Sequence, residues 1–316
     1  MNNLANPLSE ADIVAARPPK NRVDPWRPYG YFAERERAAG GKVVDVSTLL
    51  LTNRECSLRC LMCDLWKNTT DETVPRGAIP AQIAYALARL PPARHLKLYN
   101  SGSFFDRKAI PPGDWPAIAE LARPFENVIV ENHPQLCTDE CLRFRDLLGT
   151  NLEIALGLET VHPEVLVTLH KRMTIADFDR AAHFLNGAGI AVRVFLLLRP
   201  PPLGEQEGID WAVRSIEHAF AAGAAVCSII PTRAGNGIMQ RLAHSGQFSP
   251  PRLGSLERVL ERGLALGQGR VLVDLWDAGG LAACPRCRWA RIERLAQMNL
   301  SQSLLPSVTC ECLTDS

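Results

Sequence analysis

The chain has 316 residues, of which 47% are apolar, and a formal net charge of +1. This length fits one barrel-sized domain of roughly 200–250 residues with extensions, and the charge provides no overall basic field for unspecific capture of nucleic acid. No stretch approaches the roughly 18 uninterrupted apolar residues of a membrane-spanning helix, which argues against a membrane role. Ten cysteines, with no cationic and apolar cleavable N-terminus, favour a reducing compartment in which thiols bind metals. We therefore expect a cytoplasmic protein.

The chain opens with a polar extension, residues 1–42, which is punctuated by prolines and has no sustained period. Short apolar runs then alternate with amphipathic segments and predict six strands, at residues 43–51, 95–101, 127–131, 152–157, 191–198 and 225–231. The helices between them carry apolar stripes of period 3.6, such as Ile83, Leu87 and Leu90, or Ile209, Val213, Ile216 and Phe220. One helix is predicted to begin at Thr174, which can form a capping pair with Asp177.

This alternation predicts an α/β fold with a parallel sheet. Right-handed crossovers would curl the sheet into a barrel or a partial barrel, although periodicity alone equally permits a doubly wound open sheet. Ligands bind at the carboxyl ends of the strands in either arrangement. We expect three parts: the N-terminal extension 1–42, the core 43–275 and a C-terminal metal-binding extension 276–316.

Three cysteines, Cys56, Cys60 and Cys63, follow the first predicted strand at a CxxxCxxC spacing. A [4Fe–4S] cluster normally takes four thiolates, so three would leave one iron open to a small chelating molecule. The alternative is a zinc knuckle, but zinc usually takes its ligands as two separated pairs, and no fourth Cys or His lies near this triplet. The spacing therefore favours the cluster.

The cysteine motif resembles that of the radical S-adenosylmethionine (radical SAM) superfamily. The resemblance implies a six-stranded partial (β/α) barrel with a [4Fe–4S] cluster and S-adenosylmethionine (SAM) as cofactors. In that family SAM binds the open iron, and its reductive cleavage yields a 5′-deoxyadenosyl radical that takes a hydrogen atom from the substrate. A reductant such as a flavodoxin or a ferredoxin is the implied electron donor.

The resemblance also implies that SAM contacts the turn after the second predicted strand. This turn has a glycine between two serines, where family members often have a Gly-Gly-Glu-like segment. The implied contacts to the methionine amine and carboxylate are Asn100, Ser101, Gly102 and Ser103. No acidic residue closes the motif, which leaves open the group that holds the amine. Without the resemblance, the segment is a polar turn.

Further candidates for cofactor contact follow the fourth predicted strand or lie on the fifth. Glu159 follows the fourth predicted strand, where the family typically binds the ribose hydroxyls of SAM, and a solvated loop glutamate is the alternative. Lys171 or Arg172 is implied for the SAM carboxylate, although both also fit surface charges beside a helix. Arg193, on the fifth predicted strand, is the remaining candidate.

Two arginines at strand ends are candidates for substrate contact. Arg199 follows the fifth predicted strand and is beside a run of prolines, and Arg233 follows the sixth in a segment with two glycines. Loops at the mouth of a barrel often bind substrate, and here either arginine suits an anionic or carbonyl group. A charged surface loop explains both residues equally well.

A second cysteine set lies near the C-terminus. It consists of two close pairs separated by 22 residues: Cys284 and Cys287, then Cys310 and Cys312. Two such pairs suit a tetrahedral metal, either zinc or a second iron–sulfur cluster. The remaining cysteines lie in predicted apolar elements and are expected to be buried small hydrophobes: Cys137, Cys141 and Cys227.

A basic cluster lies between the two cysteine pairs. It comprises Arg286, Arg288, Trp289, Arg291 and Arg294. Arginines with an aromatic residue suit an RNA backbone and a stacked base. The alternative is a charged helix face with Trp289 packed inward.

Further motifs resemble one branch of the superfamily, which includes the radical SAM subunit of archaeosine synthase, the Elongator catalytic subunit and the tRNA methylthiotransferases. They lie at residues 100–106, 157–160, 171–174 and 196–201. A modified tRNA base is therefore one implied substrate, while the C-terminal cysteines have no counterpart that we can place in archaeosine synthase and leave another substrate open. The rival hypothesis is a non-catalytic iron–sulfur or zinc protein that binds RNA or a protein partner through its arginine-rich segment.

Overall fold

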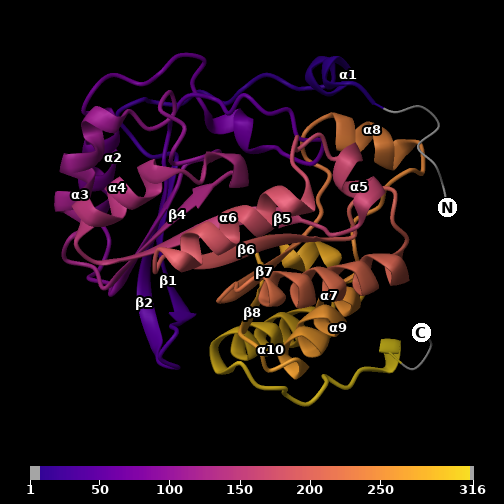
Figure 1. The fold of residues 1–316 in the computed structure, drawn as a ribbon. Helices are drawn as coiled ribbons and strands as arrows, with labels where there is room; N and C mark the ends of the chain where they lie inside the picture. The colour runs from indigo at the N-terminus through magenta and orange to yellow at the C-terminus, as the bar shows by residue number, and fades with distance from the viewer. Residues whose placement is uncertain (1–7, 314–316) are drawn as a thin grey trace.

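The computed structural model describes residues 8–313 and contains one eight-stranded sheet, whose strands follow one another in chain order (Figure 1). The strands are β1 (Gly30–Arg37), β2 (Val43–Leu50), β3 (His95–Tyr99), β4 (Asn127–Asn132), β5 (Asn151–Glu159), β6 (Ala191–Leu198), β7 (Val226–Pro231) and β8 (Arg270–Val273). β1 pairs antiparallel with β2, and every later neighbour is parallel. The α/β class and the parallel core are therefore confirmed.

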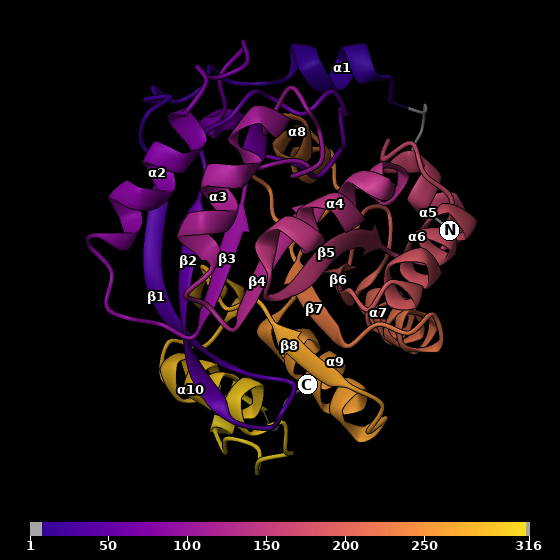
Figure 2. The same ribbon diagram turned by 60° about the vertical axis from the view of Figure 1, so that its left-hand side comes forward.

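Ten α-helices and five short 3-10 helices lie among the described residues. The α-helices are α1 (Glu10–Ala15), α2 (Ala78–Leu87), α3 (Trp115–Ala122), α4 (Asp139–Leu148), α5 (Pro163–Thr168), α6 (Ile175–Gly187), α7 (Glu205–Ala221), α8 (Ile238–His244), α9 (Leu253–Ala265) and α10 (Arg288–Ser301). The 3-10 helices are η1 (Leu65–Asn68), η2 (Pro112–Asp114), η3 (Pro134–Leu136), η4 (Ala278–Leu281) and η5 (Glu311–Leu313). The crossover helices cover the outer face of the sheet (Figures 1 and 2).

The prediction of six strands was wrong by two. The predicted strands correspond to β2 to β7, and the sheet gains β1 and β8 at its two edges. β1 has no apolar pattern because its inward side chains include Glu34 and Glu36, which bind Lys97 of β3 and Arg193 of β6. β8 has only four residues, which is too short for an apolar run to stand out from the sequence. β1 also lies within the segment expected to precede the core.

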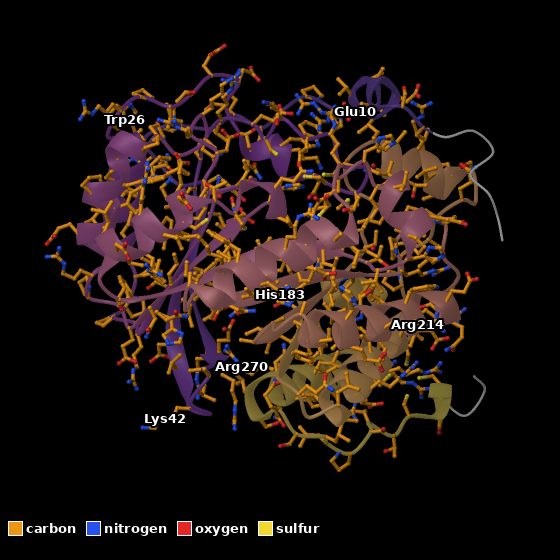
Figure 3. All side chains as sticks on the ribbon, viewed as in Figure 1. Glu10, Trp26, Lys42, His183, Arg214 and Arg270 are labelled. Carbon is orange, nitrogen blue, oxygen red and sulfur yellow. The ribbon has the colours of Figure 1, made fainter. Side chains whose placement is uncertain are left out.

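The sheet curls so that its edge strands approach one another, with α10 packed against both (Figure 2). Arg270 of β8 joins the edges directly, since its Nη1 donates to the Arg37 carbonyl of β1 at 2.7 Å. Figure 3 places Arg270 beside the amino-terminal ends of the strands, on the side of the β1–β2 turn at Lys42. The sheet is thus a partial barrel whose seam is covered by a helix.

Balanced buried charges fill part of the barrel interior. Arg193 of β6 binds Glu36 of β1 at 2.5 Å and Glu153 of β5 at 2.6 Å, and all three side chains are buried. Lys97 of β3 binds the same Glu36 at 2.6 Å. Ions in a dry interior are tolerated only when paired. The contacts of Glu36 with Lys97 and Arg193 also link β1 to β3 and β6, which are not its neighbours in the sheet.

The main apolar core lies between the sheet and its covering helices. The predicted stripe of α7 is buried there: Ile209, Val213, Ile216 and Phe220. Thr174 caps α6 in the predicted capping box with Asp177. Cys141 and Cys227 are buried as expected, and Cys137 is partly buried. No helix within residues 8–313 is both long and apolar enough to cross a membrane.

Candidate active site at the carboxyl ends of the strands

Cys56, Cys60 and Cys63 lie in the loop between β2 and η1, at the carboxyl end of β2. The loop is anchored by its backbone: Leu61 donates its N–H to the Leu169 carbonyl at 3.0 Å. The Asn236 amide, fully buried before α8, donates to the carbonyls of Leu61 at 2.6 Å and Cys63 at 3.0 Å. A loop with fixed carbonyls presents its thiols in a fixed arrangement, as a metal centre requires.

Burial acts strongly on these three thiols. It raises the pKa of Cys60 to about 11 and that of Cys63 to about 12, and also raises the pKa of Cys56. The positive charge of Lys171 opposes this effect on Cys60. The thiols also influence one another's pKa, so they lie within electrostatic reach of each other. Metal binding must therefore displace protons from thiols that are otherwise neutral at pH 7.

The N-terminal segment packs against the cysteine loop. Arg17 and Lys20 both bind Glu55, the neighbour of Cys56, at 2.7 Å. The Arg17 guanidinium also lies over the Trp66 ring, 4.5 Å from its centroid. Figure 3 places Glu10 at the end of the molecule opposite Lys42, which is the end that holds the loop. The segment thus helps to cover the loop.

The turn after β3 holds the next group of predicted residues. Asn100 is fully buried, and neither its Oδ1 nor its Nδ2 has a hydrogen-bond partner. A Cβ on Gly102 would lie 3.4 Å from the Cys56 Cβ, so this turn directly adjoins the cysteine loop. The Ser101 hydroxyl bonds Tyr29 at 2.9 Å, whereas Ser103 accepts from the His133 N–H at 3.1 Å.

Glu131, at the end of β4, supplies a carboxylate behind this turn. Its Oε1 accepts from the N–H groups of Asn100 at 2.5 Å and Gly102 at 3.4 Å. Burial raises the pKa of Glu131 to about 7, and the backbone donors act in the opposite direction. Sequence reasoning missed this residue. Its position at a strand end, followed by Asn132 and His133, was the signal that could have found it.

Glu159 and Lys171 form a buried ion pair at the carboxyl end of β5. A Cβ on Gly157 would collide with both charged groups, so the pair requires a glycine below it. The His133 ring bonds the Lys171 carbonyl at 3.0 Å and thereby joins this pair to the β3 turn. Burial lowers the pKa of His133 to about 4, so the ring is neutral at pH 7. Arg172 instead binds Glu10 at the surface.

Backbone strain is concentrated at this edge. Left-handed φ angles occur at five non-glycine residues there: Ser101, Glu159, His170, Arg172 and Arg199. Such conformations cost about 1–3 kcal/mol each and persist where surrounding contacts hold them, typically at functional sites.

Unsatisfied polar atoms point to a ligand at the same edge. Besides Asn100, the buried atoms without a partner include the hydroxyls of Thr52 and Thr232 and the Asn53 Oδ1. These residues follow β2 and β7. Since a buried polar atom left unpaired costs about 1–3 kcal/mol, a polar ligand that pairs with them would be stabilised. A cavity of about 290 Å³ beside the loop is lined by charged residues that include Arg54, Arg59 and Asp106.

The other predicted arginines are already paired. Arg193 lies in the interior charge network, away from the cysteine loop, so the structure does not bring it to the other candidates. Arg199 and Arg233 do lie at the strand ends. Arg199 binds Glu205 at 2.5 Å, and Arg233 binds Asp274 at 2.7 Å.

The C-terminal cysteines come together at a separate place. The sulfur atoms of Cys284, Cys287, Cys310 and Cys312 all lie within 4.8 Å of one another. In the basic cluster, Arg291 and Arg294 are buried and paired with Glu257 and Glu261 of α9, so neither is free to bind RNA. Trp289 is 69% exposed, so the alternative in which Trp289 packs inward is wrong.

Known proteins resemble this chain in sequence. No protein-family model matches it. Archaeosine synthase subunit beta of Methanosarcina acetivorans is 29% identical over 270 residues, which cover 80% of this chain and 77% of the relative. The protein of the same name from Thermococcus kodakarensis is 30% identical over 171 residues, covering 52% of this chain and 53% of the relative. The chain resembles the radical SAM superfamily, in the branch of archaeosine synthase.

A solved structure agrees with this resemblance at the level of the fold. The Elp3 protein of Methanocaldococcus infernus matches with a TM-score of 0.50 at 14% identity. The match covers 70% of this chain and 58% of the Elp3 chain. At this identity the likeness shows a shared fold.

Proposed function

We propose that this chain is a radical SAM enzyme in which Cys56, Cys60 and Cys63 hold a [4Fe–4S] cluster. The observation that carries the proposal is the position of their loop, beside the unpartnered Asn100 amide at the carboxyl edge of the sheet. The three thiols fit such a cluster, because they leave one iron open for SAM. When bound, the cluster supplies one electron that splits SAM and so permits hydrogen abstraction from the substrate.

The residues around the loop have distinct roles in this proposal. Asn100 and the turn at Ser101, Gly102 and Ser103 bind the methionine end of SAM, where the orphaned amide supplies both a donor and an acceptor. The Glu131 carboxylate accepts hydrogen bonds from backbone N–H groups of this turn and so holds the turn in place. In our proposal it also provides, near the amine of SAM, the carboxylate that the sequence of the turn lacks.

Glu159 and Lys171 act as one unit at the end of β5. In our proposal Glu159 accepts hydrogen bonds from the ribose, and Lys171 provides positive charge for the SAM carboxylate while it stays paired with Glu159. Arg199 and Arg233 stay candidates for substrate contact, because both lie at the rim of the same edge. Arg193 is better explained by its interior ion pairs than by cofactor contact.

The substrate that we propose is a base in RNA, most simply a modified base in tRNA. This rests on the similarity to archaeosine synthase subunit beta. The word subunit in the names of these relatives also supports a protein partner. Free thiols at all ten cysteines suit the reducing cytoplasm, in which a flavodoxin or a ferredoxin would supply the electron.

The first experiment is anaerobic reconstitution with iron and sulfide, followed by reduction with dithionite in the presence of SAM. We expect chromatography to detect 5′-deoxyadenosine from the native protein. Cys60→Ala should lose both the brown cluster absorbance and the product, whereas the control Cys137→Ala should retain both. Addition of tRNA should then raise the rate of 5′-deoxyadenosine formation above the rate without substrate.

The same experiment distinguishes the enzyme from the rival hypothesis of a non-catalytic binding protein. A protein that holds zinc alone, with no iron–sulfur absorbance after reconstitution, would contradict the enzyme and favour a non-catalytic binding protein. A cluster that cleaves SAM without any response to tRNA would keep the enzyme class and overturn the RNA substrate.

A further inference from the structure

The four C-terminal cysteines form a compact site that the proposed SAM chemistry does not use. Cys284 and Cys287 lie just before α10, and Cys310 and Cys312 lie at the end of the segment that follows it. The Sγ atoms of Cys284 and Cys310 are 3.9 Å apart, and those of Cys287 and Cys312 are 3.6 Å apart. Both distances are far longer than the roughly 2 Å of a disulfide bond.

These distances decide how many metal ions the site can hold. Zinc–sulfur bonds of about 2.3 Å in a tetrahedron place the sulfur atoms about 3.8 Å apart. The thiolates of a [4Fe–4S] cluster bind four different irons and lie roughly 6 Å apart. Here all four sulfur atoms lie within 4.8 Å of one another, which suits one metal ion and is too compact for a cubane cluster.

Two arginines of the basic cluster lie beside the four cysteines. One divalent ion with four thiolates has a net charge of −2. The Arg286 guanidinium lies within electrostatic reach of Cys284, and the Arg291 guanidinium within reach of Cys287. Hydrogen bonds from outside the ligand shell commonly orient and stabilise metal ligands. Both guanidiniums are also paired with carboxylates, Arg286 with Glu311 at 3.3 Å and Arg291 with Glu257 at 2.5 Å, so they offset only part of the charge of an occupied site.

We propose that Cys284, Cys287, Cys310 and Cys312 bind a single zinc ion, independently of the three-cysteine loop. Four thiolates leave no open position, as is typical of structural zinc. Zinc also binds nitrogen and sulfur ligands more tightly than ferrous iron does. Neither of these two arguments for zinc depends on the proposed radical SAM activity.

The metal would fasten the chain segment that holds α10 over the seam of the barrel. After α10 the chain turns at Gln302, and the Arg294 side chain binds the carbonyls of Leu305 and Pro306 at 2.6 Å and 2.8 Å. Figure 1 shows this segment running back along α10 toward η5. The zinc ion closes the loop by joining the end of the segment to the start of the helix.

The test separates the two cysteine sets in the full chain. The triple variant Cys56→Ala/Cys60→Ala/Cys63→Ala is purified and reconstituted anaerobically with iron and sulfide, and its metals are counted by mass spectrometry. We expect about one zinc per chain and no iron. Cys287→Ser should lose zinc and retain the iron of the first site, while the control Cys137→Ser should retain both metals.

A measurement on the native protein covers the case in which a variant does not fold. X-ray absorption at the zinc edge should show four sulfur neighbours at about 2.3 Å. About four irons in the triple variant, a single iron in place of zinc, or zinc bound through nitrogen or oxygen in the native protein would each overturn the proposal. Loss of SAM cleavage alone would bear on the proposed function and leave the zinc site standing.

Discussion

Glu159 and Lys171 form a buried ion pair directly above the backbone of Gly157, at the carboxyl end of β5. The pair lies beside the cysteine loop, since the Lys171 charge acts on the Cys60 thiol. Glu159 has a left-handed φ of 67°, which turns the chain at the end of the strand. A strained residue, a buried charge pair and a close glycine therefore coincide at one point of the proposed SAM site.

Gly157→Ala tests the space that this pair needs. The new methyl group would collide with Lys171 and Glu159, so we expect at least tenfold weaker SAM binding, or about 1.4 kcal/mol, with the iron content unchanged. Gly187→Ala in α6 is the matched control, because a Cβ there meets no atom within 4 Å. Equilibrium dialysis of the reconstituted protein measures both. Equal affinity in the two variants would contradict the packing argument.

Glu159→Gln, alone and combined with Lys171→Met, distinguishes the contribution of Glu159 to SAM binding from its contribution to stability. The amide keeps the shape but leaves Lys171 as an uncompensated buried charge, so we expect a loss of about 3–5 kcal/mol in the free energy of unfolding and weaker SAM binding. The double variant Glu159→Gln/Lys171→Met should recover most of the stability, as measured by urea unfolding, but not the affinity. Recovery of SAM binding in the double variant would rule out the ribose role of Glu159.

Asn236→Ala tests the anchor of the cysteine loop. The change leaves the carbonyls of Leu61 and Cys63 without their buried donor, so the loop should loosen and release its iron faster. We expect the rate of iron loss to a chelator to rise several-fold. Asn186→Ala is the control, because Asn186 also donates to two carbonyls, those of Ala222 and Gly223, away from the site. Similar rates in both variants would show that the anchor is dispensable.

Arg193→Ala tests the interior charge network. Removal of the guanidinium leaves Glu36 and Glu153 partly uncompensated in the barrel, which should lower the free energy of unfolding by about 3–5 kcal/mol. Arg262→Ala, which breaks an exposed pair with Asp210, should cost no more than about 1 kcal/mol. Urea unfolding of both variants makes the comparison. A small effect of Arg193→Ala, together with weaker SAM binding, would instead restore its predicted cofactor role.

The raised pKa of Glu131 predicts a specific pH dependence of stability. Its pKa is raised to about 7 in the folded chain, so between about pH 4.5 and 7 the folded state holds a proton that the unfolded state has lost. Stability from this group is therefore fully present below pH 4.5 and is lost as the pH rises through 7, by up to about 3 kcal/mol. Urea unfolding of the metal-free protein against Glu131→Gln isolates the effect. A pH-independent difference between the two proteins would contradict the raised pKa.

The sequence alone determined the features that depend on local pattern. The six apolar runs correspond to β2 to β7, because strands buried in a parallel sheet are mostly apolar. Thr174 and Asp177 form the predicted capping box, since capping depends on residues three positions apart. The CxxxCxxC spacing likewise placed three thiols in one loop, between β2 and η1.

The tertiary structure decided what depends on distant residues. Edge strands β1 and β8 became visible only through their partners, because charged side chains of β1 face cations on strands far along the chain. Glu131 behind the β3 turn and Asn236 beneath the cysteine loop are joined to the site by contacts across 31 and 173 residues of sequence. The 4.8 Å grouping of the C-terminal sulfur atoms likewise required folding, since two cysteine pairs fix a ligand set but not the distance between its halves. Sequence spacing sets local geometry. The pairing of buried charges and the distances between sulfur atoms of separate cysteine pairs are instead set by how separate elements pack together.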